Sequence, residues 1–536
     1  MYKRFTRALG LSRIRLQPKA PNTDEASLSG ITKLIEEKPK VFKDIYVVNP
    51  PFGSVGVEIV EGKHRYVVIE PPLNNSEAQL LKKIKDTLLE EIDLPLEALE
   101  NESMIKEYLE KQVKQVIKDR KLKIPDGNVG KFLFYVLRDF LGYGKIDVLM
   151  RDPNVEDISV DGVDSPVYVW HRTYEGIQTN ICFEKDELAS LLSRLAYKTG
   201  RQLTVSYPIL DGVLPEGYRV HVVLEGVSKR GGSFTIRKFS ENPFTIIDLI
   251  NYGVLSPKIA AYFWVLIENY RSIMVEGVTG AGKTTLLNAI SMFIHPEKKI
   301  VTIEETRELR LPHENWVPLM TRQVFQEGIQ EITLFDLLKS ALRQRPDYVI
   351  VGEVRGEEAY TLFQAISTGH GGLCSIHAES VDASIKRLMT KPMNVPPMLV
   401  PLMNVAAMVN RVKVHDAITR RITVIEEIVG VDKEKDVVTT NPVFLWTGED
   451  KDSFSFSGRS IVLEKIARFK HVSIESLFQE LEDRALVIKW MVERKLRSYC
   501  EVANIIRKFY YEREKVLRKA KLEVKIFEPK KLESTA

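Results

Sequence analysis

The feature that most constrains the fold is a glycine-rich loop placed between an apolar strand and a helix. The strand is predicted over 272–276, and the helix is predicted to begin at Lys283. Between and beyond them the chain reads Gly277-Val278-Thr279-Gly280-Ala281-Gly282-Lys283-Thr284-Thr285. Glycines let the backbone curl so that successive N–H groups point inward, and the positive end of the helix adds to that field. This spacing is typical of a loop that holds the phosphates of a nucleoside triphosphate.

Two side chains of the loop have predicted roles. Lys283 is expected to reach the β- and γ-phosphates, and the Thr284 hydroxyl is expected to bind Mg²⁺. The alternative is a glycine-rich turn without a ligand. A strand before the loop and a helix after it favour the phosphate loop over that alternative.

The loop lies in a region, 257–430, where predicted strands and helices alternate. The runs KKIVTIEE, DYVIVGE and GLCSIHA read as strands, and TLFDLLKSALRQR and EEAYTLFQAISTG read as helices. Such alternation predicts an α/β fold with a largely parallel sheet and helices on both faces.

Composition and turn signals divide the rest of the 536 residues. We predict six segments: a basic flexible arm (1–30), a mixed and helical N-terminal subdomain (31–144), an α+β subdomain (145–240), a linker (241–256), the α/β core (257–430), and a C-terminal strand patch with a helical tail (431–536).

Bulk composition argues against several classes of protein. The net charge is only +4, and basic and aromatic residues are not interleaved, so nucleic-acid binding is not expected. The three cysteines form no CxxC pair, which argues against a disulfide framework or a zinc module. No apolar run approaches the roughly 18 residues of a membrane span, and no signal-peptide core is seen, so we expect a cytoplasmic protein. The first twenty residues carry six basic and no acidic residues, which suits contact with anionic lipid or a solvated tail equally well.

Carboxylates at the ends of predicted strands are candidates for catalysis. Glu353 follows the strand in RPDYVIVGEVRG, and the carboxyl end of that strand should open beside the phosphate loop. There it can hold a magnesium-bound water or orient the attacking water. Glu304 and Glu305 end another strand, with Glu308 beyond, and one of them can polarise that water. The alternative is a row of acids at a helix N-terminus, which the helix dipole favours by itself.

Two histidines and two arginines complete the candidates. His370 and His377 flank the strand in STGHGGLCSIHAES, where a γ-phosphate sensor or a positioning pair fits better than a zinc site. Arg219 and Arg237 lie on strands of the α+β subdomain. They matter for catalysis only if that subdomain folds over a nucleotide, and otherwise they are solvated or in ion pairs.

Four motifs in one order carry a resemblance to a known family. GVTGAGKTT, TIEETREL, LRQRPDYVIVGEVRG and STGHGGLCSIHA resemble the Walker A, Asp, Walker B and His boxes of the type II/type IV secretion ATPase superfamily. DPNVEDISVDG and LPEGYRVHVV with GGSFTIRKF resemble its second N-terminal subdomain, so the resemblance covers roughly residues 145–430. The absence of a tetracysteine module, the segment ENPFTIIDLI, and the segments VNRVKV and RRITVIEEIVG make the chain look most like the archaeal branch, and within it the archaellum motor ATPases.

The resemblance implies a RecA-like P-loop ATPase core, a PAS-like α+β subdomain before it, and helical extensions at both ends. It also implies a Mg²⁺-dependent ATPase that works as a homo-hexamer on a polytopic membrane platform protein, at the inner face of the membrane. The catalytic residues it implies are Glu304 or Glu305, Glu353, His370, His377, Arg219 and Arg237. This chain has Glu305 where the family often has Asp, and whether the arginines reach their own or a neighbour's nucleotide stays open.

Three functions remain to be weighed. A mechanochemical ATPase for assembly, or assembly plus rotation, of an archaellum is favoured, with archaeal pilus assembly or secretion as its near alternative. A nucleic-acid translocase with a RecA-like core is disfavoured by the near-neutral charge. A P-loop phosphotransferase is disfavoured because no acceptor pocket or lid is evident in the sequence.

Overall fold

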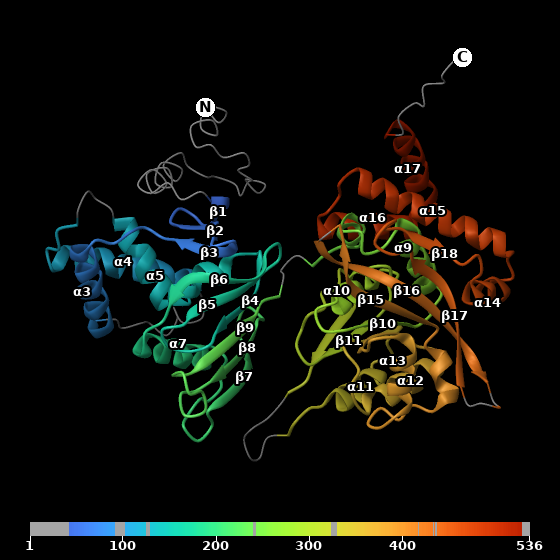
Figure 1. Cartoon of the computed structure of the whole chain (residues 1–536), viewed down its shortest axis with the longest axis horizontal. Helices are drawn as coiled ribbons and strands as arrows, with labels where there is room; N and C mark the ends of the chain where they lie inside the picture. Colours follow the sequence, from blue (N-terminus) through green and yellow to red (C-terminus); the bar gives the residue numbers. More distant parts are fainter. Residues whose placement is uncertain are drawn as a thin grey trace. The chain divides into compact units, whose positions relative to one another are not determined.

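The chain divides into two compact units, residues 1–240 and 241–536, which are described separately (Figure 1). The computed structural model describes residues 42–91, 102–124, 129–239, 243–322, 330–415, 417–432, 434 and 437–527. The basic arm predicted over 1–30 lies outside the described residues.

The first unit is built on a nine-stranded sheet in the order β1-β2-β3-β6-β5-β4-β9-β8-β7. Its strands are β1 (Phe42–Asn49), β2 (Gly53–Val60), β3 (Lys63–Ile69), β4 (Val155–Val160), β5 (Pro166–His171), β6 (Glu175–Cys182), β7 (Ile209–Val213), β8 (Arg219–Val223) and β9 (Ser233–Arg237). Alternate residues of β6 are buried and exposed, as expected for a sheet with one face on a core. Neighbouring strands are antiparallel except β3 and β6, which pair in parallel at Arg65–Gln178 and Tyr66–Thr179. One sheet therefore runs through both predicted N-terminal subdomains.

A buried carboxylate ties the first three strands to the rest of this sheet. Asp152, fully buried before β4, accepts hydrogen bonds of 2.6 Å from the hydroxyls of Tyr46 on β1 and Tyr66 on β3. The Tyr46 hydroxyl also lies 3.3 Å from His171 Nε2 on β5. A buried charge needs several such donors to offset its lost hydration.

Helices cover the sheet and form a small bundle beside it. They are α3 (Asn75–Glu91), α4 (Glu102–Asp119), α5 (Val129–Phe140), α6 (Asp147–Arg151) and α7 (Lys185–Lys198), with a 3₁₀ turn at Gly144–Ile146. Leu188, Leu191, Leu192 and Leu195 form one apolar stripe of α7 and are buried in the sheet's core. α3, α4 and α5 share a separate core that includes Ile84, Val113 and Phe132.

The second unit contains another nine-stranded sheet, in the order β12-β11-β13-β14-β10-β15-β16-β17-β18. Its strands are β10 (Ile273–Gly277), β11 (Ile300–Glu304), β12 (Trp316–Met320), β13 (Tyr348–Val351), β14 (Gly371–His377), β15 (Val405–Val414), β16 (Ala417–Asp432), β17 (Val437–Trp446) and β18 (Phe454–Phe456). From β12 to β15 all pairs are parallel, and from β15 to β18 they are antiparallel. The strand before the glycine loop, β10, lies inside the sheet, and β14 separates it from β13. This is a RecA-like α/β core, as predicted.

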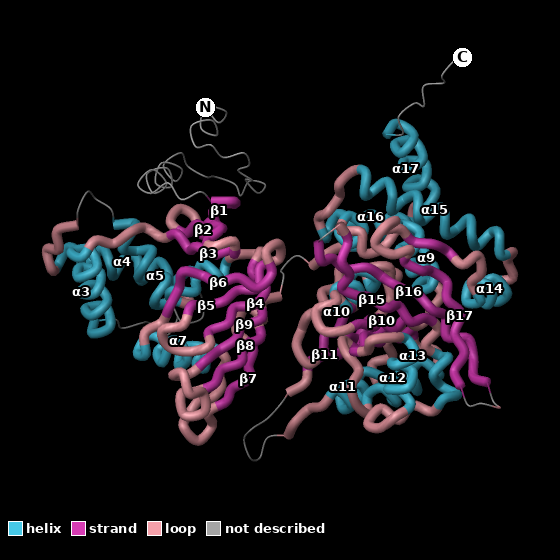
Figure 2. The backbone as a smooth tube through the Cα atoms, viewed as in Figure 1, coloured by secondary structure: helices cyan, strands magenta, loops and turns pink. Residues whose placement is uncertain are grey.

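Two hydrophobic cores lie on the two faces of this sheet. The helices are α8 (Ile246–Asn251), α9 (Pro257–Glu268), α10 (Lys283–Ser291), α11 (Leu334–Leu342), α12 (Glu358–Ser367), α13 (Val381–Met389), α14 (Ile461–Lys470), α15 (Ile474–Glu493), α16 (Tyr499–Tyr511) and α17 (Arg513–Phe527). Ile273 and Val275 of β10 belong to the core with α9, α10 and α15, and Met274 belongs to the core with α11, α12 and α13. The two helix groups flank the strands in Figure 2. The alternation in β10 explains why the strand reads as continuously apolar: both of its faces are covered.

The segment predicted as a linker contains a buried helix. Thr245 caps α8, because its side chain accepts a hydrogen bond from Asp248 N, and the Asp248 carboxylate accepts one from Thr245 N. Ile246 and Ile247 are fully buried in the core of the second unit. The Asn-Pro signal that suggested a linker precedes a capping box, which begins a helix.

Candidate active site

The glycine loop leaves β10 with a backbone that side chains would obstruct. Gly277 has φ 154°, and a Cβ there would lie 2.4 Å from the Val409 carbonyl oxygen of β15. Gly280 and Gly282 have φ of 71° and 97°, and Cβ atoms there would meet nothing within 4 Å. The left-handed conformations favour glycine. The loop is thus pressed against β15 at its start and open at its tip, which suits a cradle for phosphates.

Lys283 is the first residue of α10 and folds back over the loop. Its Nζ donates a hydrogen bond to the Val278 carbonyl oxygen at 3.3 Å. Partial burial lowers its pKa, while the nearby Glu353 carboxylate opposes that shift. Thr284 and Thr285 follow in the first turn of α10 and are half-buried. The loop, the ammonium group and a hydroxyl at a helix N-terminus fit a triphosphate with its Mg²⁺.

Glu353 lies two residues beyond the end of β13 and is held by an arginine. Arg355 contacts two carboxylates, Glu353 at 2.9 Å and Glu305 at 3.3 Å. Despite partial burial, the hydrogen bond and charge of Arg355, followed by Lys283 and His377, lower the pKa of Glu353. An ionised carboxylate can bind the metal or orient a water. The structure therefore gathers Glu353, Glu305 and Lys283 at the carboxyl ends of the parallel strands.

Glu304 and Glu305 have different surroundings although they are adjacent. Glu304 ends β11 and is 3% exposed, and its Oε1 accepts hydrogen bonds from the backbone N–H groups of Glu308 and Leu309 at 2.9 Å. Burial raises its pKa to about 7, and its Oε2 has no hydrogen-bond partner. Glu305 is exposed. Glu304 thus holds the following turn in place with one oxygen, while its other oxygen is buried without a hydrogen-bond partner.

The two histidines lie at opposite ends of β14. His377, at the carboxyl end, pairs in register with Gly277, and its Nδ1 lies 3.1 Å from the Gly277 carbonyl oxygen. His370 precedes the strand, and its Nδ1 lies 3.0 Å from the Ala365 carbonyl oxygen and 3.1 Å from Thr368 Oγ1. At about 3.3 Å per residue, the strand separates them by roughly 20 Å. His377 is therefore at the loop, and His370 is not brought to this site within the unit.

The two candidate arginines belong to the first unit, on neighbouring strands. Arg219 of β8 is directly opposite Arg237 of β9, and both are exposed. Arg237 Nε lies 3.0 Å from Asp157 Oδ1, and Arg219 lies 3.8 Å from Asp211 Oδ1. They form a pair of cations on one face of that sheet, each beside a carboxylate.

The family follows from comparison with known proteins. The family model described as type II/IV secretion system protein matches residues 146–467, which is more than half of the chain. The chain belongs to the type II/IV secretion system protein family. The resemblance stated from the four boxes is thereby confirmed.

Relatives within the type II/IV secretion system family come from archaea and bacteria. The uncharacterized protein MJ0900 of Methanocaldococcus jannaschii is 38% identical over 490 residues, covering 87% of this chain and 88% of its own length. The type IV secretion system protein PtlH of Bordetella pertussis is 31% identical over 266 residues, covering 45% of this chain and 78% of its own. Among solved structures, the VirB11 ATPase of the Brucella suis type IV secretion system, in complex with sulphate, is 27% identical and covers 51% of this chain and 89% of its own, with a TM-score of 0.27.

Three residues near the site of this secretion-family chain had not been predicted from the sequence. Arg420 of β16 lies with its Nε 3.4 Å from the Gly280 carbonyl oxygen. Arg387 of α13 donates a hydrogen bond to the His377 carbonyl oxygen at 2.5 Å. Glu276, the residue before Gly277, is fully buried and accepts a hydrogen bond from the Ser384 hydroxyl at 2.5 Å. Of these three residues, only Glu276 had a signal in the sequence, because it is a charged residue within the apolar run before the loop.

Among the residues that the structure describes, no helix is both long enough and apolar enough to span a membrane.

Proposed function

We propose that the chain is a Mg²⁺-dependent ATPase that powers the assembly, or the assembly and rotation, of an archaellum. The observation that carries the ATPase proposal is the open glycine loop with Lys283 folded over it and Glu353 held beside it. Family membership and a full-length archaeal relative support the placement among filament and secretion machines.

Each side chain of the site has a proposed task. The loop N–H groups and Lys283 bind the β- and γ-phosphates of ATP, and the Thr284 hydroxyl with Glu353 holds Mg²⁺. Mg²⁺, when bound, neutralises charge that develops between the β- and γ-phosphates. Glu353, or Glu304 through its free oxygen, orients the attacking water, and His377 positions the end of β14 beside the loop. Arg355 holds Glu353 and Glu305 in place beside the loop.

The remaining parts of the proposal concern assembly. The protein works as a homo-hexamer at the cytoplasmic face of the membrane, where nucleotide-driven movement of the first unit acts on a polytopic platform protein. Arg219 and Arg237 would bring cations to a triphosphate, and His370 would act from a neighbouring copy. The basic residues of 1–30 would contact anionic lipid. Archaeal pilus assembly and secretion are the alternatives within the same class.

Replacing Lys283 by alanine tests both the proposed ATPase activity and the proposed role in the archaellum. Phosphate release from ATP should fall at least ~100-fold, because one cation that stabilises transferring phosphate is lost. Unchanged release would reject the ATPase site. In cells, the same substitution should abolish swimming together with archaellum filaments seen by electron microscopy. Normal swimming with loss of other surface filaments or of secreted protein would instead assign the chain to a pilus or a secretion system.

A further inference from the structure

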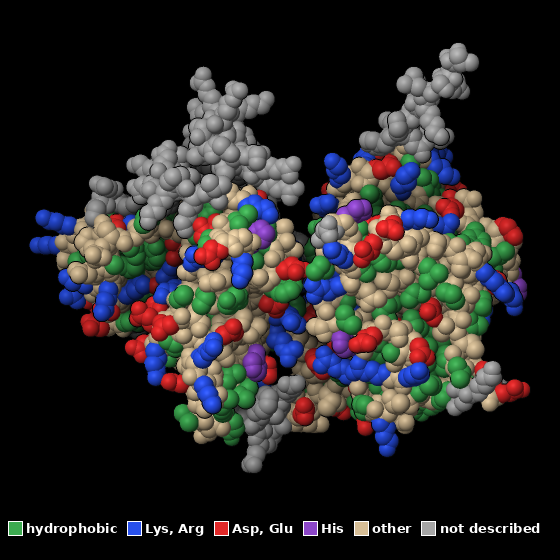
Figure 3. Space-filling view, in the orientation of Figure 1, with side chains coloured by type: hydrophobic (Ala, Val, Ile, Leu, Met, Phe, Trp, Pro, Cys, Tyr) green, Lys and Arg blue, Asp and Glu red, His purple; other side chains and the backbone are tan. Residues whose placement is uncertain are grey.

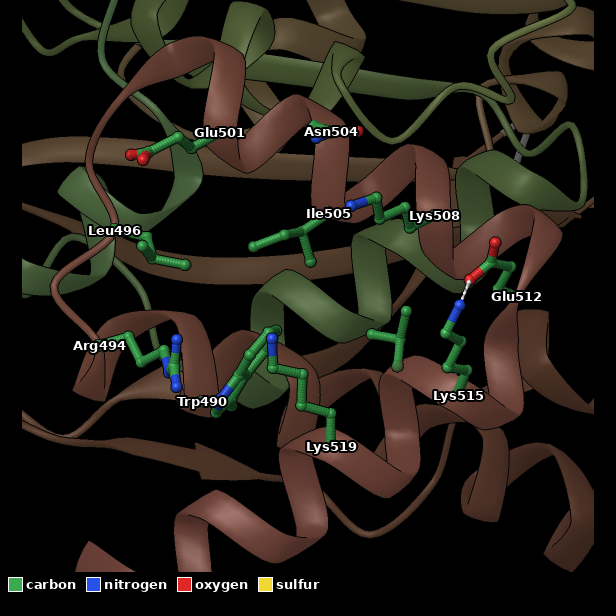
Figure 4. A pocket seen from close by; sticks show the side chains of 11 residues that line it. Trp490, Arg494, Leu496, Glu501, Asn504, Ile505, Lys508, Glu512, Lys515 and Lys519 are labelled. Atoms are coloured by element: carbon green, nitrogen blue, oxygen red, sulfur yellow. Dashed lines mark ion pairs between the residues drawn. The ribbon is translucent and has the colours of Figure 1, made fainter.

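The last three helices lie beyond the family-matched residues and enclose a groove. α15, α16 and α17 follow residue 467, where the match ends. Between them lies a groove of about 480 Å³, shown in Figure 4. It is lined by Trp490, Arg494, Leu496, Glu501, Asn504, Ile505, Lys508, Glu512, Lys515, Val516 and Lys519.

The groove has an apolar floor and a length that matches a helix. Its lining surface is mostly apolar, and Leu496, Ile505, Val516 and Trp490 are the apolar residues that line it. The Trp490 indole is fixed by a hydrogen bond of 2.7 Å from Nε1 to Glu523. From Glu501 to Glu512 the groove follows nearly the whole of α16. At 1.5 Å per residue this is about 16 Å, or three helical turns.

The rim carries more positive charge than its own acids neutralise. Arg494 pairs with Glu523 at 2.5 Å, and Lys515 pairs with Glu512 at 2.9 Å, the contact dashed in Figure 4. Among the described residues, no carboxylate lies within ion-pair distance of Lys508 or Lys519. The sequence of α17 has six basic residues and two acidic ones, and Lys and Arg side chains gather over it in Figure 3.

We propose that this groove docks an acidic amphipathic helix of a partner protein. Apolar side chains of that helix would cover Leu496, Ile505 and Val516, and its carboxylates would pair with Lys508 and Lys519. An apolar floor with charged edges is how helix-binding grooves recognise their ligands. Charge complementarity selects an acidic helix, because four cations (Arg494, Lys508, Lys515 and Lys519) and only two carboxylates (Glu501 and Glu512) line the groove.

The opposite side of α16 is bonded to the nucleotide-binding half of the core. The Tyr510 hydroxyl donates a hydrogen bond of 2.5 Å to the Phe293 carbonyl oxygen, just after α10, and accepts one of 2.9 Å from Trp264 Nε1. The Tyr499 hydroxyl donates to the Arg310 carbonyl oxygen, and Arg310 N donates to Asn288 Oδ1 on α10 at 2.9 Å. Since α10 begins at Lys283, a helix docked on α16 is linked to the loop through one helix of the core. The docked partner therefore changes the rate of ATP hydrolysis, a consequence that rests on the proposed function.

A displayed library of helical peptides, selected on the full-length protein, tests the docking directly. The expected ligands combine Glu or Asp with large apolar residues at helical spacing. A synthetic peptide made from them, labelled with fluorescein, should bind the protein with an anisotropy change. Its Glu-to-Gln analogue should bind at least tenfold more weakly. Selected peptides without acidic residues would contradict the charge argument.

Charge reversal locates the site. The double variant Lys508→Glu/Lys519→Glu should weaken binding of the acidic peptide at least tenfold, and Asn504→Trp, which fills the groove from an exposed position, should do the same. Arg518→Glu/Lys521→Glu is the matched control: it makes the same charge change at two exposed positions of α17 that do not line the groove, and it should leave Kd within twofold. Equal binding to the double variant and to the control would overturn the proposal.

Two further outcomes would assign the groove to another occupant and reject the partner helix. Binding that is seen only after deletion of residues 528–536 would mean that the chain's own end fills the groove. Binding to phosphatidylserine vesicles that the double variant abolishes, with no peptide selected, would mean a lipid surface. Anisotropy reads docking without ATP, so a failed ATPase proposal would remove the rate change and leave peptide binding intact.

Discussion

At the scale of single residues, the surroundings of two buried acids decide how the core responds to pH. Glu276 precedes the glycine loop and has one carboxylate oxygen on Ser384 and the other without a partner. Burial raises its pKa from an ordinary value of 4.5 to about 8. Burial raises the pKa of Glu304 as well. Both are protonated more readily in the folded state than in the unfolded chain.

The contribution of Glu276 to the stability of the second unit should therefore fall as pH rises. Between pH 4.5 and 8 the unfolded chain releases the Glu276 proton while the folded protein keeps it, so the stabilisation is complete below 4.5 and lost above 8. Between pH 5.5 and 8.5, the free energy of unfolding of the Glu276→Gln variant should fall by on the order of 1–3 kcal/mol less than that of the wild type. Urea unfolding followed by tryptophan fluorescence checks this, because four of the five tryptophans lie in residues 241–536.

Glu297→Gln, a substitution at the exposed edge of the same unit, is the control and should leave the pH dependence unchanged. A Glu276→Gln variant that keeps the full wild-type pH dependence would show that Glu276 does not cause it.

Sequence reasoning located the residues of the site better than their roles. Glu353 was predicted to lie beside the glycine loop at the carboxyl end of a parallel strand, and the structure places it there. The structure also brings His377 to the loop, a position that the sequence had not predicted. The separation of His370 from His377 was readable from the sequence, because the run between them was predicted as a strand, and a strand of that length spans roughly 20 Å. The difference between Glu304 and Glu305 was not readable. It depends on the turn at Glu308 and Leu309 folding back to hydrogen-bond one carboxylate.

At the scale of elements, the sequence predicted individual strands and helices from local patterns, but it did not predict which distant strands pair. Apolar runs bounded by turns predicted β10, β11, β13 and β14. Nothing in the sequence near Arg65 indicates that β3 pairs in parallel with β6, more than a hundred residues later. The helix α8 was missed because Asn-Pro turn signals outweighed a capping box at Thr245. Tertiary burial of Ile246 and Ile247 then completes a helix too short to be stable by itself.

The junction between β1–β3 and the rest of their sheet should depend on Asp152. Removing its carboxylate by Asp152→Ala leaves the hydroxyls of Tyr46 and Tyr66 without their acceptor, at a cost of about 2–4 kcal/mol. Amide hydrogen exchange in β1 and β3 should then rise at least tenfold. Asp186→Ala on the exposed first turn of α7 should change neither strand. Equal protection in both variants would show that Asp152 does not hold the junction.

At the scale of the whole molecule, the candidate site residues are divided between the two units. The loop, Lys283 and Glu353 belong to residues 241–536, and the arginine pair belongs to residues 1–240. Each unit has its own hydrophobic core. The α15–α17 groove adds a third surface beyond the family-matched residues. Such a division suits a motor in which ATP is bound by one unit and movement is delivered through others.

The central claim is that the glycine loop and Glu353 form an ATP-hydrolysing site, and Glu353→Gln tests it most directly. The substitution keeps the shape of the side chain and removes its charge. ATP should still bind, with a Kd within about threefold of wild type, while hydrolysis falls at least ~100-fold. Binding is measured with a fluorescent ATP analogue, and hydrolysis by phosphate release from the same sample. Wild-type hydrolysis by Glu353→Gln would contradict the account.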